Sequence, residues 1–130
     1  MNNDLVRILN DRDYYHFFDN KTEFYTTFAK YIGRQWLDFS KASKEDFKAF
    51  METRDAVMVK PESSSGGFGV NKLFKKDFCH AWTPSYDQLK AEGIGVVEDV
   101  LQQHETMNKM NPHAINTCGW SQCSTRRAPI

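Results

Sequence analysis

The stretch from residue 57 to 70, VMVKPESSSGGFGV, holds the residues whose types and spacing suggest chemistry most directly. A short apolar run ends at Lys60 and Pro61, and three serines and three glycines then lie within residues 63–69. Serine hydroxyls and free backbone N–H groups can donate hydrogen bonds to an anion such as phosphate, and glycine lets the backbone approach a ligand closely. The pattern predicts two strands joined by a Gly/Ser loop, the flap (residues 63–69), with a lysine at its base.

The order of these residues excludes two better-known phosphate-binding loops. A P-loop has the form G-x-x-x-x-G-K-[ST], and neither Lys-Ser nor Lys-Thr follows the glycines here. A protein kinase carries its lysine on the strand after the Gly-rich loop, whereas Lys60 comes before it. From the residues alone, a flexible hairpin turn with an incidental lysine explains the stretch as well as a phosphate-binding flap does.

The composition limits the class of protein and its partners. Among 130 residues, 17 Lys and Arg balance 17 Asp and Glu, so no overall basic field favours nucleic acid. No apolar stretch approaches the ~20 residues that cross a bilayer, and the first residues lack the regions of a signal peptide. Three cysteines, Cys79, Cys118 and Cys123, fit neither a disulfide framework nor a zinc pattern. We therefore expect one small cytoplasmic domain, or a piece of a larger one, with reduced thiols, no zinc site and no transmembrane segment.

Capping signals and apolar spacing predict the main elements. Asn20 followed by Glu23 has the form of a capping box and predicts a helix over residues 21–32, and Ser43 with Asp46 predicts the start of a second helix. The other elements are expected as strands at 35–39, 56–60, 70–74 and 94–98 and as one or two helical turns at 86–91. Together they predict an α+β fold, with a mixed or antiparallel sheet and helices on one side.

The helix predicted after Asn20 places Lys21 in its first turn. A cation there opposes the helix dipole, and local conflicts of this kind can mark a functional residue. A solvent-exposed lysine at a small energetic cost is the alternative interpretation.

Further motifs lie downstream of the flap. The stretch 94–105 reads IGVVEDVLQQHE, a buried strand that ends in the carboxylate of Glu98, and residues 111–117 read NPHAINT. Combined with V-M-V-K-P-x-x-S-S-G-G-x-G-V, these motifs resemble the ATP-grasp superfamily, most closely its sugar-transfer-associated branch, which is related to α-L-glutamate ligase-like proteins. The upstream D-N-K-x-x-F and Y-I-G-R-Q-W-L stretches are similar to the N-terminal part of that branch. The resemblance spans about Tyr14 to Thr117.

The resemblance implies a function as well as a fold. It implies the nucleotide-binding lobe of an ATP-grasp ligase-like protein, a class that activates a carboxylate as an acylphosphate for attack by an amine or a similar nucleophile. The branch suggests a role in cell-surface polysaccharide or envelope synthesis, with a carboxylate or sugar-linked acceptor that the sequence does not identify. ATP is the implied ligand, and Mg²⁺ is expected for the family.

The resemblance also implies roles for individual residues. Lys60 would reach the adenine side and the α-phosphate, the flap would fold over the β- and γ-phosphates, and Glu98 would meet the adenine amino group. The backbone of residues 99–101 would form the hinge beside the base. The full set of implied nucleotide-binding residues is Lys21, Lys60, Ser63, Ser64, Ser65, Gly66, Gly67, Gly69, Glu98, Asp99, Val100 and Leu101. His104, Asn116 and Thr117 match positions on the substrate side, and no residue is identified as catalytic.

The chain departs from the family pattern after Thr117. The family continues with an apolar residue and an arginine, whereas this chain reads CGWSQCSTRRAPI, without helical or strand periodicity. No acidic residue follows Thr117, so the family's Mg²⁺ ligands are not found. We therefore expect a partial ATP-grasp domain over residues 1–117, a non-family tail over 118–130 and no C-terminal lobe, through truncation or a shifted reading frame.

Two classes of function follow. In the first, the chain is the ATP-binding portion of a ligase-like protein and is by itself an incomplete enzyme. In the second, it is a non-catalytic remnant or interaction module that turns over no nucleotide. A kinase-like phosphotransferase is a third class, but neither H-x-D nor D-F-G occurs in the sequence. Nucleotide binding distinguishes the first class from the second.

Overall fold

The computed structural model describes residues 11–78 and 82–117, without the side chains of residues 82–84. The chain divides into two compact units, the first ending at Val100 and the second beginning at Leu101. The predicted thiols Cys79, Cys118 and Cys123 and the predicted tail 118–130 lie outside the described residues.

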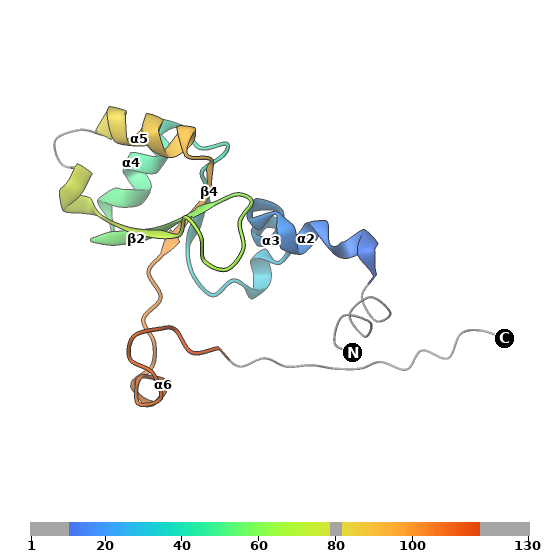
Figure 1. Cartoon of the computed structure of the whole chain (residues 1–130). Helices are drawn as coiled ribbons and strands as arrows, with labels where there is room; N and C mark the ends of the chain where they lie inside the picture. Colours follow the sequence, from blue (N-terminus) through green and yellow to red (C-terminus); the bar gives the residue numbers. More distant parts are fainter. Residues whose placement is uncertain (1–10, 79–81, 118–130) are drawn as a thin grey trace. The chain divides into compact units, whose positions relative to one another are not determined.

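The first unit is built on a four-stranded sheet with the strand order β1-β4-β2-β3 (Figure 1). Every neighbouring pair of strands is antiparallel. The strands are β1 (Trp36–Asp38), β2 (Ala56–Pro61), β3 (Asn71–Phe74) and β4 (Ile94–Asp99). The prediction of an α+β fold with an antiparallel sheet is confirmed at this level.

Short helices precede, connect and follow the strands. In the first unit they are η1 (Arg12–Tyr14), α2 (His16–Asp19), α3 (Lys21–Thr27), η2 (Ala29–Tyr31), α4 (Lys44–Glu52), η3 (Lys75–Phe78) and α5 (Trp82–Ala91), and the described part of the second unit contains α6 (Glu105–Asn108). The helix predicted over 21–32 is therefore interrupted. It ends at Thr27, and its last turns form the separate 3₁₀ helix η2.

The capping prediction is confirmed at one helix and only in part at the other. At α4, the Ser43 hydroxyl accepts from the Asp46 N–H at 3.1 Å, and the Asp46 carboxylate accepts from the Ser43 N–H at 2.9 Å. At α3, the Asn20 side chain accepts from the Glu23 N–H at 2.9 Å, but the Glu23 carboxylate instead contacts His16 Nδ1 at 2.7 Å. The backbone of Asn20 already donates to the His16 carbonyl, which closes α2 and leaves Glu23 without that partner.

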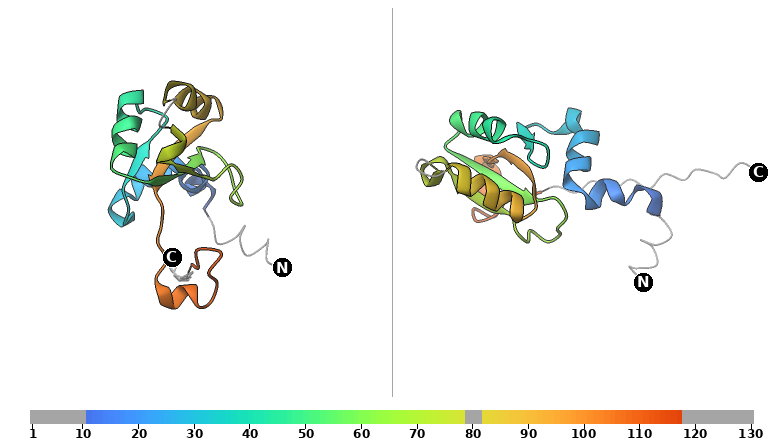
Figure 2. Two further views of the ribbon diagram at one scale, coloured as in Figure 1. Left: turned by 90° about the vertical axis from the view of Figure 1, so that its left-hand side faces the viewer. Right: turned by 90° about the horizontal axis from the view of Figure 1, so that it is seen from above.

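The hydrophobic core lies on one face of the sheet. The helices α4 and α5 cover this face (Figure 2). Val57 and Val59 of β2 and Val97 of β4 point into it and are almost completely buried. Phe47 of α4 and Leu89 of α5 cover them. Burial of this apolar area is the main force that holds these helices to the sheet.

The helix α3 contacts the opposite face, so the prediction of helices on one side describes α4 and α5 only. Residues that stand opposite each other on antiparallel strands point to the same face. Trp36 pairs with Glu98 in this way, and the ring of Tyr25 on α3 lies 5.2 Å from the ring of Trp36. The first unit therefore has a main helical layer on one face and a smaller contact on the other.

Gly95 on β4 permits the close approach of two segments to the sheet. A Cβ atom at this position would lie 2.8 Å from Glu62 Cβ and 3.0 Å from Thr22 Oγ1. Glu62 itself donates its backbone N–H to the carbonyl of Gly93 at 3.1 Å. The missing side chain of Gly95 thus lets α3 and the start of the flap lie directly on β4.

We predict that Gly95→Ala lowers the free energy of unfolding by about 2 kcal/mol, because the new methyl group overpacks the contact with Glu62 and Thr22. Urea denaturation followed by circular dichroism measures the change. Gly33→Ala is the matched control: a Cβ there meets nothing within 4 Å, so the change should stay within about 0.5 kcal/mol. Equal effects of the two substitutions would contradict the steric explanation.

Candidate functional site

A buried carboxylate on β4 is the centre of the candidate site. The side chain of Glu98 is 3% exposed. Its Oε1 lies 2.6 Å from the Nζ of Lys60, and its Oε2 lies 2.7 Å from the Nε of Arg34. The hydroxyl of Tyr25 also donates to Oε2. Each carboxylate oxygen thus has a cationic partner, as a buried charge requires.

The sheet register and two flanking segments bring these four side chains together. Met58 stands opposite Glu98, and Lys60, two residues further along β2, points to the same face. Tyr25 reaches this face from α3, and Arg34 comes from the connection just before β1. Tyr25 also accepts from Lys60 at 3.1 Å and from Arg34 at 2.5 Å, so its hydroxyl links the two cations.

Tyr25 and Arg34 were missed by the sequence analysis. Arg34 lies within the Y-I-G-R-Q-W-L stretch, and Tyr25 directly follows the D-N-K-x-x-F stretch. Neither residue has a distinctive spacing of its own. Burial, and next to it the hydrogen bond to Glu98, raises the pKa of Tyr25 above its ordinary value. The phenol is therefore neutral at physiological pH and can donate to the carboxylate.

Lys21 joins α3 to the flap. Its Nζ donates to the Ser64 carbonyl at 2.5 Å and to the Ser64 hydroxyl at 2.9 Å. Its backbone N–H donates to the carbonyl of Glu62 at 3.0 Å, and Asn20 forms a bridge with Ser63. The N-terminal end of α3 is therefore fixed to the start of the flap by both side chain and backbone.

The positive charge of Lys60 acts on the ammonium group of Lys21. Burial lowers the pKa of Lys21 below its ordinary value, and the positive charge of Lys60 lowers it further. The two lysines, predicted from separate motifs, thus lie close enough at the base of the flap for their charges to interact. An anion placed between them would relieve this repulsion.

The flap adopts a conformation that depends on its glycines. Gly66, Gly67 and Gly69 have positive φ angles of 63°, 79° and 70°. Non-glycine residues rarely adopt such angles. A Cβ on Gly69 would also lie 2.6 Å from Pro61 Cγ, so the return of the flap beside the end of β2 requires glycine.

The tip of the flap is open to solvent. Ser63, Ser65 and the three glycines are exposed, and the ring of Phe68 is 79% exposed. Within the flap, Phe68 donates its N–H to the Ser65 carbonyl at 3.3 Å. The exposed hydroxyls and backbone groups are thus available to a ligand that approaches this side of the sheet.

The predicted hinge residues continue from β4. Asp99 donates its N–H to the Gln35 carbonyl at 3.0 Å, and its carboxylate accepts from Arg54 Nε at 2.6 Å. Asp99 therefore supports the sheet edge with both backbone and side chain. Val100 is the last residue of the first unit and Leu101 the first of the second.

The predicted substrate-side residues lie in the second unit. His104 caps α6, where its Nδ1 accepts from the Thr106 N–H at 3.2 Å. The Asn116 side chain donates to the Gln103 side chain at 3.0 Å and to the Met107 carbonyl at 2.8 Å. Thr117 is exposed. In this unit, His104 and Asn116 therefore organise the local turn.

Within residues 11–78 and 82–117, no group of three or more His, Cys, Asp or Glu side chains is arranged to hold a metal ion. Among the same residues, no helix combines the length and apolar character needed to cross a bilayer. The chain matches no protein-family model, no curated protein and no solved structure.

We predict that Glu98→Gln lowers the free energy of unfolding by about 3 kcal/mol, because it leaves Lys60 and Arg34 without their buried counter-charge. Urea denaturation measures the loss. Asp38→Asn is the control, since the Asp38 partner Lys41 is 79% exposed and such pairs contribute at most about 1 kcal/mol. A loss at Glu98 no larger than that at Asp38 would contradict the central role of the buried carboxylate.

We also predict that Lys60→Met raises the pKa of Lys21. The substitution removes the positive charge that lowers this pKa, whereas burial still keeps it below the ordinary value of 10.5. The titration of the Lys21 side chain, followed by NMR, measures the change. Lys48→Met on α4, on the other side of the sheet, should leave the Lys21 titration unchanged, and an unchanged titration in Lys60→Met would show that the lysines do not interact.

Proposed function

We propose that this chain is the ATP-binding portion of an ATP-grasp ligase-like protein. The observation that carries the proposal is the convergence of Lys21 and Lys60, from two separate motifs, at the base of an exposed Gly/Ser flap. Phosphate groups are bound in proteins by lysine side chains and by hydroxyl and backbone N–H donors. The flap and the two lysines offer this combination.

Lys21 has the contacts expected of a residue that changes partners on binding. Its ammonium group donates to a neutral carbonyl and a neutral hydroxyl of Ser64. A phosphate oxygen is a stronger acceptor, since charge-assisted hydrogen bonds are about twice as strong as neutral ones. Release of Ser64 by Lys21 would also free the flap to fold over the phosphates.

Glu98 has one acceptor site left for the adenine amino group, and a neighbouring side chain must move to expose it, because the Glu98 side chain is 3% exposed. A carboxylate has about four acceptor sites, and the three donors around Glu98 occupy three of them. Those donors fix its orientation on the sheet face. Met58, directly opposite Glu98 and half-buried, supplies an apolar surface for the base.

ATP-grasp ligases use the phosphoryl group of ATP to activate a carboxylate, and the residues described here bind and orient the nucleotide for that purpose. They include no ligand set for Mg²⁺, so no step through the metal is assigned to them. The proposals for the acceptor and for a role in envelope synthesis rest on the sequence resemblance alone.

Isothermal titration calorimetry with ATP and ADP, each with Mg²⁺, tests the proposal on the full chain. We predict saturable binding, and at least tenfold weaker binding by Lys21→Met because a charge-assisted contact to phosphate is lost. At 100 times the dissociation constant, ATP should add about 2.7 kcal/mol to the free energy of unfolding of the parent chain.

Lys48→Met is the matched control, since it removes an exposed lysine on α4 and should bind ATP as the parent does. Circular dichroism establishes that each variant is folded. A folded parent that does not bind ATP, or a Lys21→Met variant that binds it as tightly, would contradict the proposal. The first result would favour the non-catalytic interaction module.

A further inference from the structure

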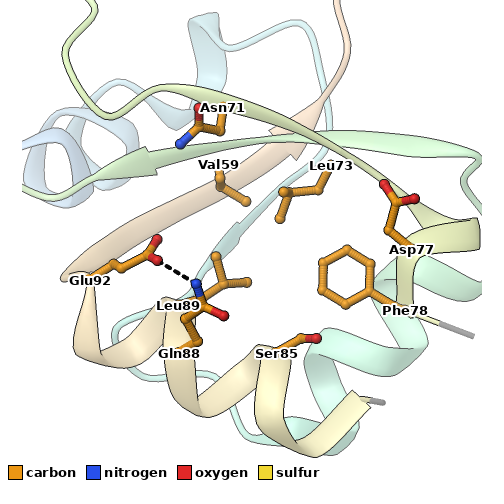
Figure 3. Close-up of a pocket in the computed structure, with 9 residues that line it drawn as sticks. All are labelled: Val59, Asn71, Leu73, Asp77, Phe78, Ser85, Gln88, Leu89 and Glu92. Carbon is orange, nitrogen blue, oxygen red and sulfur yellow. Dashed lines mark hydrogen bonds between the residues drawn. The ribbon is translucent and has the colours of Figure 1, made fainter. Parts of the chain in front are cut away.

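The face of the sheet opposite to Lys60 and Glu98 carries a separate cavity of about 280 Å³ (Figure 3). It lies between the β2–β3 strands, η3 and α5. Val59 of β2 lines it, and Asn71 of β3, which stands opposite Val59, does so too. Lys60 follows Val59 along the strand and points to the other face. The cavity is therefore distinct from the candidate nucleotide site.

One part of the cavity lining is apolar, and Asn71, Ser85 and Gln88 add polar side chains. Val59, Phe78 and Leu89 are buried, and Leu73 is half-buried (Figure 3). These side chains come from β2, η3, α5 and β3, so several elements of one compact unit line the cavity. Such a surface favours a ligand with an apolar body.

The opening of the cavity carries negative charge. Asp77 of η3 and Glu92, just after α5, stand on opposite sides of it (Figure 3). No lysine or arginine is among the described residues that line the cavity. The neighbouring Lys90 donates to the carbonyl of Phe39 at 2.5 Å, so its charge is directed away.

We propose that this cavity binds a small organic amine, with the apolar body between Val59, Leu73 and Leu89 and the ammonium group at Glu92, on the side of the cavity opposite to Asp77. Glu92 Oε1 accepts from Gln88 Nε2 at 2.8 Å, which orients the carboxylate and leaves its second oxygen for the ligand. The volume lies near the lower end of the range for ligand pockets, which fits a molecule of about ten non-hydrogen atoms. The proposal does not rest on ATP binding.

Titration of phenethylammonium into the ¹⁵N-labelled full chain, followed by NMR, tests the proposal. We expect saturable shifts at Leu73 and Leu89. The isosteric alcohol 2-phenylethanol should bind at least threefold more weakly, because it lacks the charge. The double variant Asp77→Asn/Glu92→Gln should weaken amine binding about fivefold, roughly the contribution of one exposed ion pair.

Two controls separate this site from other surfaces. Glu45→Gln removes an exposed carboxylate on α4 and should leave amine binding unchanged, as should Lys21→Met at the candidate nucleotide site. The proposal is overturned if a folded chain shows no saturable shifts at Leu73 and Leu89, or if the alcohol binds as tightly as the amine. Equal binding by the double variant and the parent would overturn it as well.

Discussion

The buried ion pairs of Glu98 are the interaction on which the first unit depends. A carboxylate that is 3% exposed on the central part of a sheet is costly unless every charge around it is matched. Lys60, Arg34 and Tyr25 meet this requirement from three different segments. The same requirement fixes α3 and the connection before β1 against the sheet, so the electrostatics of one residue determine much of the architecture around it.

The flap is coupled to this cluster through Lys21. The lysine lies in the first turn of α3, where the helix dipole disfavours a cation, and it is instead stabilised by the carbonyl and hydroxyl of Ser64. Burial and Lys60 lower its pKa, so its charge is held against two unfavourable influences. The two lysines lie beside the exposed Gly/Ser flap, and the charge of Lys60 is paired with Glu98. On the opposite face, Asp77 and Glu92 stand on either side of the cavity.

The sequence predicted those helices and strands whose stabilising contacts lie between residues close together in the chain. Ser43 and Asp46 satisfy each other within four residues, and the strands around the flap follow from apolar runs ended by Lys60 and Pro61. The prediction for α3 was less complete, because the Asn20 backbone bonds to His16 and the helix ends early at Thr27. Those outcomes depend on the preceding turn of α2 and on contacts of Tyr25 with the sheet, which a local pattern does not contain.

The sequence by itself determined the flap, its glycines, the lysine at its base and the strand that carries Glu98. Turns and strands depend on the types of neighbouring residues, so a short stretch of sequence is enough to predict them. Only the tertiary structure decided that Lys21 meets Ser64, that Arg34 and Tyr25 complete the shell around Glu98, and that α3 lies on the face away from α4 and α5. The register of β2 against β4 places Lys60 beside Glu98. Such pairings join residues far apart in the chain, and they follow from the free-energy cost of leaving a buried charge unpaired.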